Sequence, residues 1–156
     1  ARDLGFDVML NPVNILSYSK DTLSYLLPIL NDFNPKCVSI VDTFGSLLPE
    51  DLDYIFETFD KNLNDEISIG LHLHENLSIS LALAIEFTNM LSNKRKAYID
   101  SSILGMGRIP GNLCTELIID SLKTTSGSCR TPKRRLHQFG FLIVSTCVKF
   151  SNARTA

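Results

Sequence analysis

The sequence predicts an α/β domain built from four strand–helix units and followed by a basic tail. Four apolar, β-branched runs recur at steps of 32, 29 and 30 residues, and each is followed by a segment with helical periodicity. The chain has 156 residues, of which 44% are hydrophobic, enough for one domain with a buried core. We expect residues 1–123 to form this domain and residues 124–156 to form an irregular tail.

The four apolar runs are the expected strands. Their bounds are Phe6–Leu10, Val38–Val41, Ile67–Leu73 and Ala97–Ile103. Strands that alternate with helices pair in parallel, because each crossover helix returns the chain to the same end of the sheet. Two architectures fit this pattern: a doubly wound open sheet, and half of a (β/α)₈ barrel, whose eight units need about 250 residues. Periodicity alone does not separate them.

The first two expected helices have recognisable starts. Ser19 is a suitable N-cap for a helix over Lys20–Phe33, although Pro28 removes a backbone hydrogen bond and predicts a kink or break. Pro49 suits the first turn of the second helix, which ends before a loop at Asn62–Asp65. The residues expected to be buried are Leu23, Leu26, Leu27 and Leu30 in the first helix, and Leu52, Ile55, Phe56 and Phe59 in the second.

The third helix is expected over Leu77–Leu91 with Asn76 as its N-cap, and the fourth begins after Asn112. Their expected packing residues are Leu77, Leu81, Ala84, Ile85 and Phe87 in the third helix, and Leu113, Leu117, Ile118 and Leu122 in the fourth.

Two histidines, His72 and His74, fall at the end of the third expected strand. Residues two apart in a strand point to the same side, roughly 6 to 7 Å apart, which suits two ligands of one divalent metal ion. The carboxyl ends of parallel strands are also where such architectures carry their chemistry. The pattern favours a metal site, and the alternative is a pair of hydrogen-bonded histidines at the rim of the core.

A glycine-rich turn follows the fourth expected strand. Gly105, Gly107 and Gly111 are spaced as G-x-G-x-x-x-G, which differs from the dinucleotide-binding fingerprint. The turn opens a helix and could cradle an anion, but as a nucleotide-binding signal it is weak.

Three motifs at successive strand ends carry a family resemblance. They are Val41-Asp42-Thr43-Phe44-Gly45, His72-Leu73-His74-Glu75-Asn76, and Gly105-Met106-Gly107-Arg108 followed by Gly111-Asn112-Leu113-Cys114-Thr115-Glu116. Over about Gly5 to Lys123 the chain resembles the family of 4-hydroxy-2-oxovalerate aldolase, hydroxymethylglutaryl-CoA lyase, homocitrate synthase and isopropylmalate synthase. The resemblance implies a pyruvate-carboxyltransferase-type (β/α)₈ TIM barrel, of which this chain corresponds to units five to eight, the C-terminal half.

The resemblance also implies a cofactor and its ligands. In this family the His-x-His pair binds a divalent cation, often manganese, magnesium or zinc. Carried over to this sequence, the metal ligands are His72, His74 and Asn112. The implied chemistry is carbon–carbon bond cleavage, as in an aldolase or lyase, or condensation, with a 2-oxo acid reacting through an enolate that the metal stabilises.

Three further residues are implied to bind the substrate. Asp42 and Thr43 would line the pocket, and Arg108 would meet a substrate carboxylate. Taken singly, each has a plainer interpretation: Asp42 can cap a turn, Arg108 can be a solvated loop residue, and Asn112 can be the N-cap of the fourth helix.

The sequence departs from the family in one respect that bears on activity. The family's first strand supplies an acidic metal ligand and an Arg within an Asp-x-Thr-x-Arg-Asp type motif, and this sequence has no such motif. We therefore expect a fragment of the enzyme that associates with itself or with a missing N-terminal half-barrel. The alternative is a non-catalytic half-barrel that serves as an interaction module, or a remnant.

Charge and cysteine usage limit the other possibilities. The net charge of −2 combines a body of −8 with a tail that has six basic residues and no acidic one: Arg130, Lys133, Arg134, Arg135, Lys149 and Arg154. The basic stretch has no interleaved aromatic residues, so it favours a solvated linker over nucleic-acid binding, and its composition is also typical of a truncated or frame-shifted end. The apolar run Phe139–Phe150 is too short to span a membrane but could cover a sheet edge.

The four cysteines form no metal-finger pattern, and nothing at the N-terminus resembles a signal peptide. These two features predict a cytoplasmic protein with reduced thiols.

Overall fold

The computed structural model describes residues 2–91, 95–125, 142–145 and 149–151, with side chains described within 3–91 and 95–122. The described strands are β1 (Met9–Leu10), β2 (Cys37–Val41), β3 (Ser68–His72), β4 (Ala97–Ser101), β5 (Leu142–Ser145) and β6 (Lys149–Ser151). The α-helices are α1 (Lys20–Phe33), α2 (Pro49–Asn62), α3 (Ser80–Met90) and α4 (Thr115–Thr125). Short 3-10 helices lie at η1 (Arg2–Leu4), η2 (Ile15–Ser17) and η3 (Ile103–Gly105).

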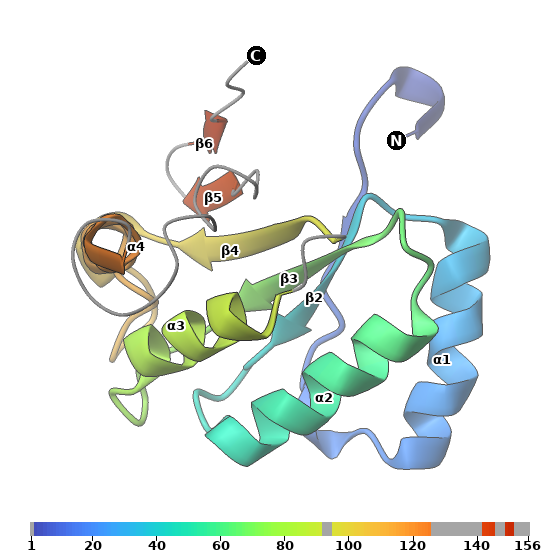
Figure 1. The fold of residues 1–156 in the computed structure, drawn as a ribbon, viewed down its shortest axis with the longest axis horizontal. Helices are drawn as coiled ribbons and strands as arrows, with labels where there is room; N and C mark the ends of the chain where they lie inside the picture. Colours follow the sequence, from blue (N-terminus) through green and yellow to red (C-terminus); the bar gives the residue numbers. More distant parts are fainter. Residues whose placement is uncertain (1, 92–94, 126–141, 146–148, 152–156) are drawn as a thin grey trace.

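The strands form one sheet in the order β1-β2-β3-β4-β5-β6. Strands β1 to β5 run parallel, and β6 pairs antiparallel with β5. Helices α1, α2 and α3 lie side by side as a layer against the sheet (Figure 1). The predicted α/β fold, with four parallel strands alternating with helices, is confirmed.

One edge of the four-strand core is covered by a strand from the C-terminal part of the chain. Strand β5 lies within the apolar run from Phe139 to Phe150 and pairs with β4 from Tyr98 to Ser101. Residues 124–156 are therefore not irregular throughout, because a run of apolar residues can pair with the open edge of β4. The basic residues from Arg130 to Arg135 lie outside the described part.

The two faces of the sheet differ in chemistry. One face carries buried aliphatic residues that pack with the helices: Val38, Ile40, Ile69, Leu71 and Ile99. The alternate positions are small or polar: Cys37 and Ser39 on β2, Ser68, Gly70 and His72 on β3, and Tyr98 and Asp100 on β4. Because side chains alternate along a strand, the apolar face fixes the register and places His72 and Asp100 together on the other face.

Three predicted strands are longer than the observed ones. The first was expected from Phe6, but β1 has only two residues, and Phe6 lies outside it with 65% of its surface exposed. Strand β3 ends at His72 and β4 ends at Ser101, so His74 lies beyond its strand. The chain turns away at these ends, where the loops of the candidate site begin.

Helices α1 and α2 match the prediction closely. The Ser19 side chain accepts a hydrogen bond from the Thr22 N–H at 3.1 Å, as expected of an N-cap. The prediction of a break at Pro28 is wrong, since α1 continues through it. Pro28 has no N–H to donate to the carbonyl of Ser24, four residues earlier. Both residues are exposed, so water can hydrogen-bond to that carbonyl. The expected apolar residues of α2 are all buried.

Helices α3 and α4 begin three and two residues later, respectively, than their expected N-caps predict. Asn76 is not the N-cap of α3, because Ser78 adopts a φ of 57° in an intervening turn and the helix begins at Ser80. Leu77 is consequently exposed, contrary to expectation. Helix α4 begins at Thr115, so Asn112 is not its N-cap. Leu117 is also exposed, again contrary to expectation.

None of the helices in the described part is long and apolar enough to cross a membrane.

Candidate metal centre

The candidate site lies where β2, β3 and β4 end. His72 is the last residue of β3, and the sheet register places Val41 on one side of it and Asp100 on the other. Asp42 and Thr43 follow β2 directly. The parallel strands therefore bring residues from three sequence segments to one edge, as predicted from the βα pattern.

The two imidazoles are adjacent. The ring centroids of His72 and His74 are 5.1 Å apart, with an interplanar angle of 73°. Both side chains are partly buried. The expected pairing of the two histidines at one point is therefore observed, even though only His72 lies on the strand.

Each imidazole is held through its Nδ1 atom. The Nδ1 atom of His74 lies 2.7 Å from the backbone carbonyl of Asp42, and that of His72 lies 3.1 Å from Oδ2 of Asp100. A carbonyl or an ionised carboxylate only accepts hydrogen bonds, so Nδ1 of a neutral ring carries the proton in both cases. Each ring then has an unprotonated Nε2. This is the arrangement in which metal-binding histidines are normally held, with one nitrogen anchored and the other available.

Asn112 lies beside this pair. Its backbone forms an isolated antiparallel bridge with His74, and its side-chain Nδ2 donates to the Met106 carbonyl at 2.9 Å. Since only the amide nitrogen can donate, this bond fixes the orientation of the amide. Its Oδ1 is buried and has no hydrogen-bond partner among the described residues. A buried oxygen without a partner requires an explanation, and a bound cation supplies one.

The glycines of the loop allow this packing. A Cβ on Gly107 would lie 2.2 Å from Nδ2 of Asn112, closer than any real Cβ contact. At Gly111, φ is +132° and a Cβ would lie 2.6 Å from the Gly105 carbonyl. The loop also hydrogen-bonds to the histidine segment, because the Glu75 N–H donates to the Gly111 carbonyl at 3.0 Å. The glycine-rich turn thus serves to hold Asn112.

Asp42 and Thr43 make hydrogen bonds to nearby backbone. Oδ1 of Asp42 accepts from the N–H groups of Ser46 at 2.9 Å and Leu47 at 3.2 Å, and Oγ1 of Thr43 accepts from the Asn14 N–H at 2.6 Å. Burial raises the pKa of the Asp42 carboxyl, and the backbone N–H groups partly offset that shift. Both residues stabilise loops at the site, and their role in substrate binding stays a prediction.

Arg108 is exposed at the rim of the glycine-rich loop. Its guanidinium has no hydrogen bond or ion pair with another residue of the described part. It is therefore open to solvent and to a ligand, and its assignment to a substrate carboxylate also stays a prediction.

Asp100 is the residue at this site that the sequence analysis missed. It contacts His72, yet it was taken only as part of the strand run Ala97–Ile103. A signal was present, because Asp100 is the one acidic residue of the strand sequence Ala-Tyr-Ile-Asp-Ser, and a carboxylate in a buried strand needs a partner.

The donor set fits a divalent metal ion, although it lacks a carboxylate ligand. No group of three His, Cys, Asp or Glu side chains that could hold a metal is found among the described residues. Imidazole nitrogens and an amide oxygen are donors of the kind that zinc and manganese accept, and His72, His74 and Asn112 together would offer such a mixed set. A carboxylate supplied from elsewhere would complete it.

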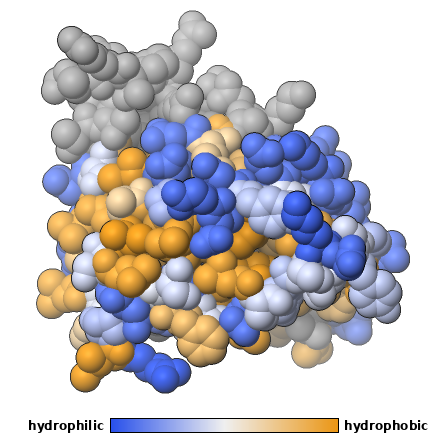
Figure 2. All heavy atoms as spheres, turned by 90° about the horizontal axis from the view of Figure 1, so that it is seen from below, coloured by the Kyte–Doolittle hydropathy of each residue, from blue (hydrophilic) through white to orange (hydrophobic). Residues whose placement is uncertain are grey.

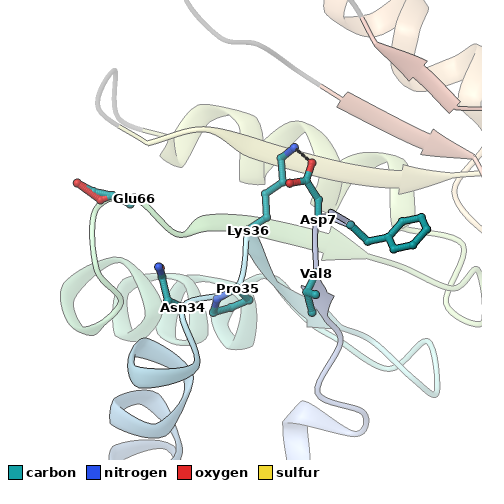
Figure 3. A pocket seen from close by; sticks show the side chains of 7 residues that line it. Asp7, Val8, Asn34, Pro35, Lys36 and Glu66 are labelled. Atoms are coloured by element: carbon teal, nitrogen blue, oxygen red, sulfur yellow. Dashed lines mark hydrogen bonds and ion pairs between the residues drawn. The ribbon is translucent and has the colours of Figure 1, made fainter. Parts of the chain in front are cut away.

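A hollow of about 330 Å³ lies at the other end of the strands. It is lined by Phe6, Asp7, Val8, Asn34, Pro35, Lys36 and Glu66 (Figure 3). Lys36 and Glu66 come just before β2 and β3, and Lys36 forms an ion pair with Asp7. None of the candidate metal or substrate residues lines this hollow, so it is separate from the site at the carboxyl ends.

A comparison with protein-family profiles shows which family the chain belongs to. Residues 1–145 match the profile of the HMGL-like family. The chain belongs to the HMGL-like family. This confirms the resemblance to the pyruvate carboxyltransferase group that was inferred from the three strand-end motifs.

Individual relatives of this HMGL-like chain include enzymes of 2-oxo acid chemistry. It is 26% identical over 138 residues to 4-hydroxy-2-oxovalerate aldolase from Pseudoalteromonas translucida, covering 81% of this chain and 37% of the aldolase. It is 28% identical over 123 residues to oxaloacetate decarboxylase from Mycobacterium tuberculosis, covering 79% of this chain and 35% of the decarboxylase.

A solved structure resembles the fold. The chain superimposes on the N-terminal domain of a candidate aldolase from Bacteroides vulgatus with a TM-score of 0.67 and 26% identity, covering 83% of this chain and 42% of the other. The chain thus spans about two fifths or less of the proteins that it matches.

Proposed function

We propose that this HMGL-like chain forms the metal-binding part of a lyase or aldolase that acts on 2-oxo acids. The observation that supports the proposal is the hydrogen bonding of His72 and His74, since both rings are anchored through Nδ1 and both therefore offer Nε2 to a ligand. The buried and unpartnered Oδ1 of Asn112 adds a third donor.

Each residue of the site would have a distinct role. His72, His74 and Asn112 hold a divalent ion of manganese, magnesium or zinc, and Arg108 pairs with the substrate carboxylate at the rim. When bound, the metal supplies Lewis-acid stabilisation of the negative charge that develops on the 2-oxo oxygen as the carbon–carbon bond is cleaved or formed. Asp42 and Thr43 hold the loop after β2 at the edge of that pocket.

Direct metal titration tests this proposal. Isothermal titration calorimetry with manganese, magnesium and zinc should show weak binding by the wild-type chain, because the site has no carboxylate ligand, and loss of that binding in His72→Ala and His74→Ala. His137→Ala is the matched control, since it removes the only other histidine of the sequence. Equal heats in the wild-type and His72→Ala proteins would remove His72 from the site.

The non-catalytic alternative is favoured by a different observation. The sequence has no Asp-x-Thr-x-Arg-Asp type motif, so the acidic ligand and Arg that the family's first strand provides are absent. We therefore expect no turnover by this chain alone. Either a separate N-terminal half-barrel supplies these residues, or the chain is a non-catalytic half-barrel that associates with a second copy of itself as an interaction module, or a remnant. Pyruvate release from a 4-hydroxy-2-oxo acid above a His74→Ala control would instead show that the chain is an enzyme by itself. The assignment to units five to eight and the cytoplasmic location stay predictions.

A further inference from the structure

We propose that Asp100 is a positioning residue that holds His72 in the tautomer whose Nε2 can bind a metal ion. The inference rests on the proposed function, and it adds to the site a residue that would not itself contact the metal. Its basis is the contact between Oδ2 of Asp100 and Nδ1 of His72, at 3.1 Å.

The sheet supports this contact. Asp100 lies directly beside His72 in the register of β3 and β4. Neighbouring strands are about 4.8 Å apart, and two side chains on the same face at paired positions meet without any loop having to fold first. The side chain of His72 is 23% exposed and that of Asp100 is 17% exposed, so water competes poorly for the hydrogen bond between them. The fold therefore forms the contact without any ligand.

His74 provides an internal contrast. Its Nδ1 is held by the main-chain carbonyl of Asp42, which no side-chain substitution at Asp100 removes. His72 depends on a side chain instead. A neutral imidazole can carry its proton on either nitrogen, so without an acceptor at Nδ1 the ring of His72 would also populate the tautomer with a proton on Nε2. That tautomer cannot bind a metal through Nε2.

The test compares Asp100→Asn with Asp53→Asn in the full chain. The asparagine keeps the shape of Asp100, but its amide can donate as well as accept and no longer selects one tautomer. Asp53 is exposed on α2, so Asp53→Asn removes the same charge away from the site. Nitrogen-15 NMR of the histidine side chains, in metal-free protein at about pH 8, distinguishes the two tautomers directly; this pH lies above the ordinary histidine pKa of about 6.5.

We expect His72 to be protonated only on Nδ1 in the wild-type and Asp53→Asn proteins, and to show a mixture in Asp100→Asn, with His74 unchanged in all three. An unchanged His72 tautomer in Asp100→Asn would overturn the proposal. If Asp100→Asn fails to fold, Asp100→Ser removes the same acceptor with a smaller side chain and is read in the same way. A merely structural contribution of Asp100 to the sheet would not shift the tautomer of one ring.

Metal titration of the same proteins separates this inference from the proposed function. Loss of an outer hydrogen-bond partner typically weakens metal binding 10- to 100-fold, and we expect Asp100→Asn to bind manganese or zinc more weakly than Asp53→Asn by about that factor. Unchanged affinity alongside a shifted tautomer would overturn the positioning role. If the wild-type chain binds no metal, the proposed function fails, while the NMR result still decides whether Asp100 sets the tautomer of His72.

Discussion

His74 and Asn112 form an isolated antiparallel bridge, which joins the loop after β3 to the glycine-rich loop after η3. The two residues are far apart in sequence, and the bridge brings their backbones side by side. The Met106 carbonyl then fixes which way the amide points. The position of Asn112 therefore depends on the conformation of the glycine-rich loop, and this dependence can be tested.

Gly107→Ala should weaken metal binding without unfolding the chain. The added methyl group would lie 2.2 Å from Nδ2 of Asn112, so the amide must move away from the Met106 carbonyl and its Oδ1 loses its orientation. We expect about a tenfold or greater loss of metal affinity, measured by calorimetry. Gly5→Ala is the control: its φ of +78° strains the backbone, but nothing lies within 4 Å of a Cβ there, so the change should leave metal affinity unaltered. Equal loss in both variants would argue against a specific role for Gly107.

The stability of Asp42→Asn relative to the wild type should depend on pH. The difference in free energy of unfolding should favour the variant more at neutral pH than at low pH. Burial raises the pKa of Asp42 in the folded state, so the folded chain holds the proton more tightly than the unfolded chain. That contribution is fully present below the ordinary carboxyl pKa and is lost as the pH rises through the raised value. Urea unfolding from about pH 3.5 to 7 should show the wild type gaining stability on the variant as the pH falls. A constant difference across that range would contradict the pKa shift.

Arg95→Met should destabilise the fold by about 3 kcal/mol. The buried guanidinium pairs with Asp60, with a separation of 2.8 Å between Nε and Oδ1, and donates to the carbonyls of Leu63, Asn64 and Ile67. Its removal leaves these acceptors without their partner between the end of α2 and the start of β3. Chemical unfolding measures the change. Lys96→Met, at an exposed neighbour, should change stability by less than about 0.5 kcal/mol.

The outer side of α1 should mediate association of the chain with a second copy. Helix α1 is the terminal helix of its layer (Figure 1), and Tyr25, Ile29 and Phe33 form a row at four-residue spacing with exposures of 76%, 46% and 50%. Hydrophobic side chains also gather on the face of the molecule shown in Figure 2. Large apolar patches rarely stay exposed in a monomer. We expect light scattering to show a dimer or larger species, and Ile29→Asp to reduce it.

Two comparisons sharpen the association test. Leu77→Asp places the same charge at an exposed leucine away from α1 and should leave the association unchanged. A chain ending at Lys123 loses β5, which exposes the edge of β4, so it should associate more strongly than the full chain. A wild-type monomer that is unaffected by this truncation would contradict the exposed-edge argument.

The local sequence determined the order and type of most elements. The β-branched runs and the apolar stripes of α1 and α2 predicted alternating strands and helices, because an element with one buried face has apolar residues at periodic positions. The strand-end motifs likewise identified the family, and they predict one metal site formed by His72, His74 and Asn112. Helix starts were less readable: Asn76 has the chemistry of an N-cap, but a turn through Ser78 delays α3 to Ser80.

What only the tertiary structure decided is which atom of each site residue is engaged. Asp42 was expected to line a pocket, yet its Oδ1 accepts from the backbone of the following turn, and its own carbonyl anchors His74. Asp100 became a partner of His72 through strand register, which a single strand sequence does not contain. Sequence patterns predict which side of an element is buried, because apolar side chains are preferentially placed in the core. Hydrogen-bond partners between distant segments depend on how those elements are placed against one another in space, and only the folded chain fixes that placement.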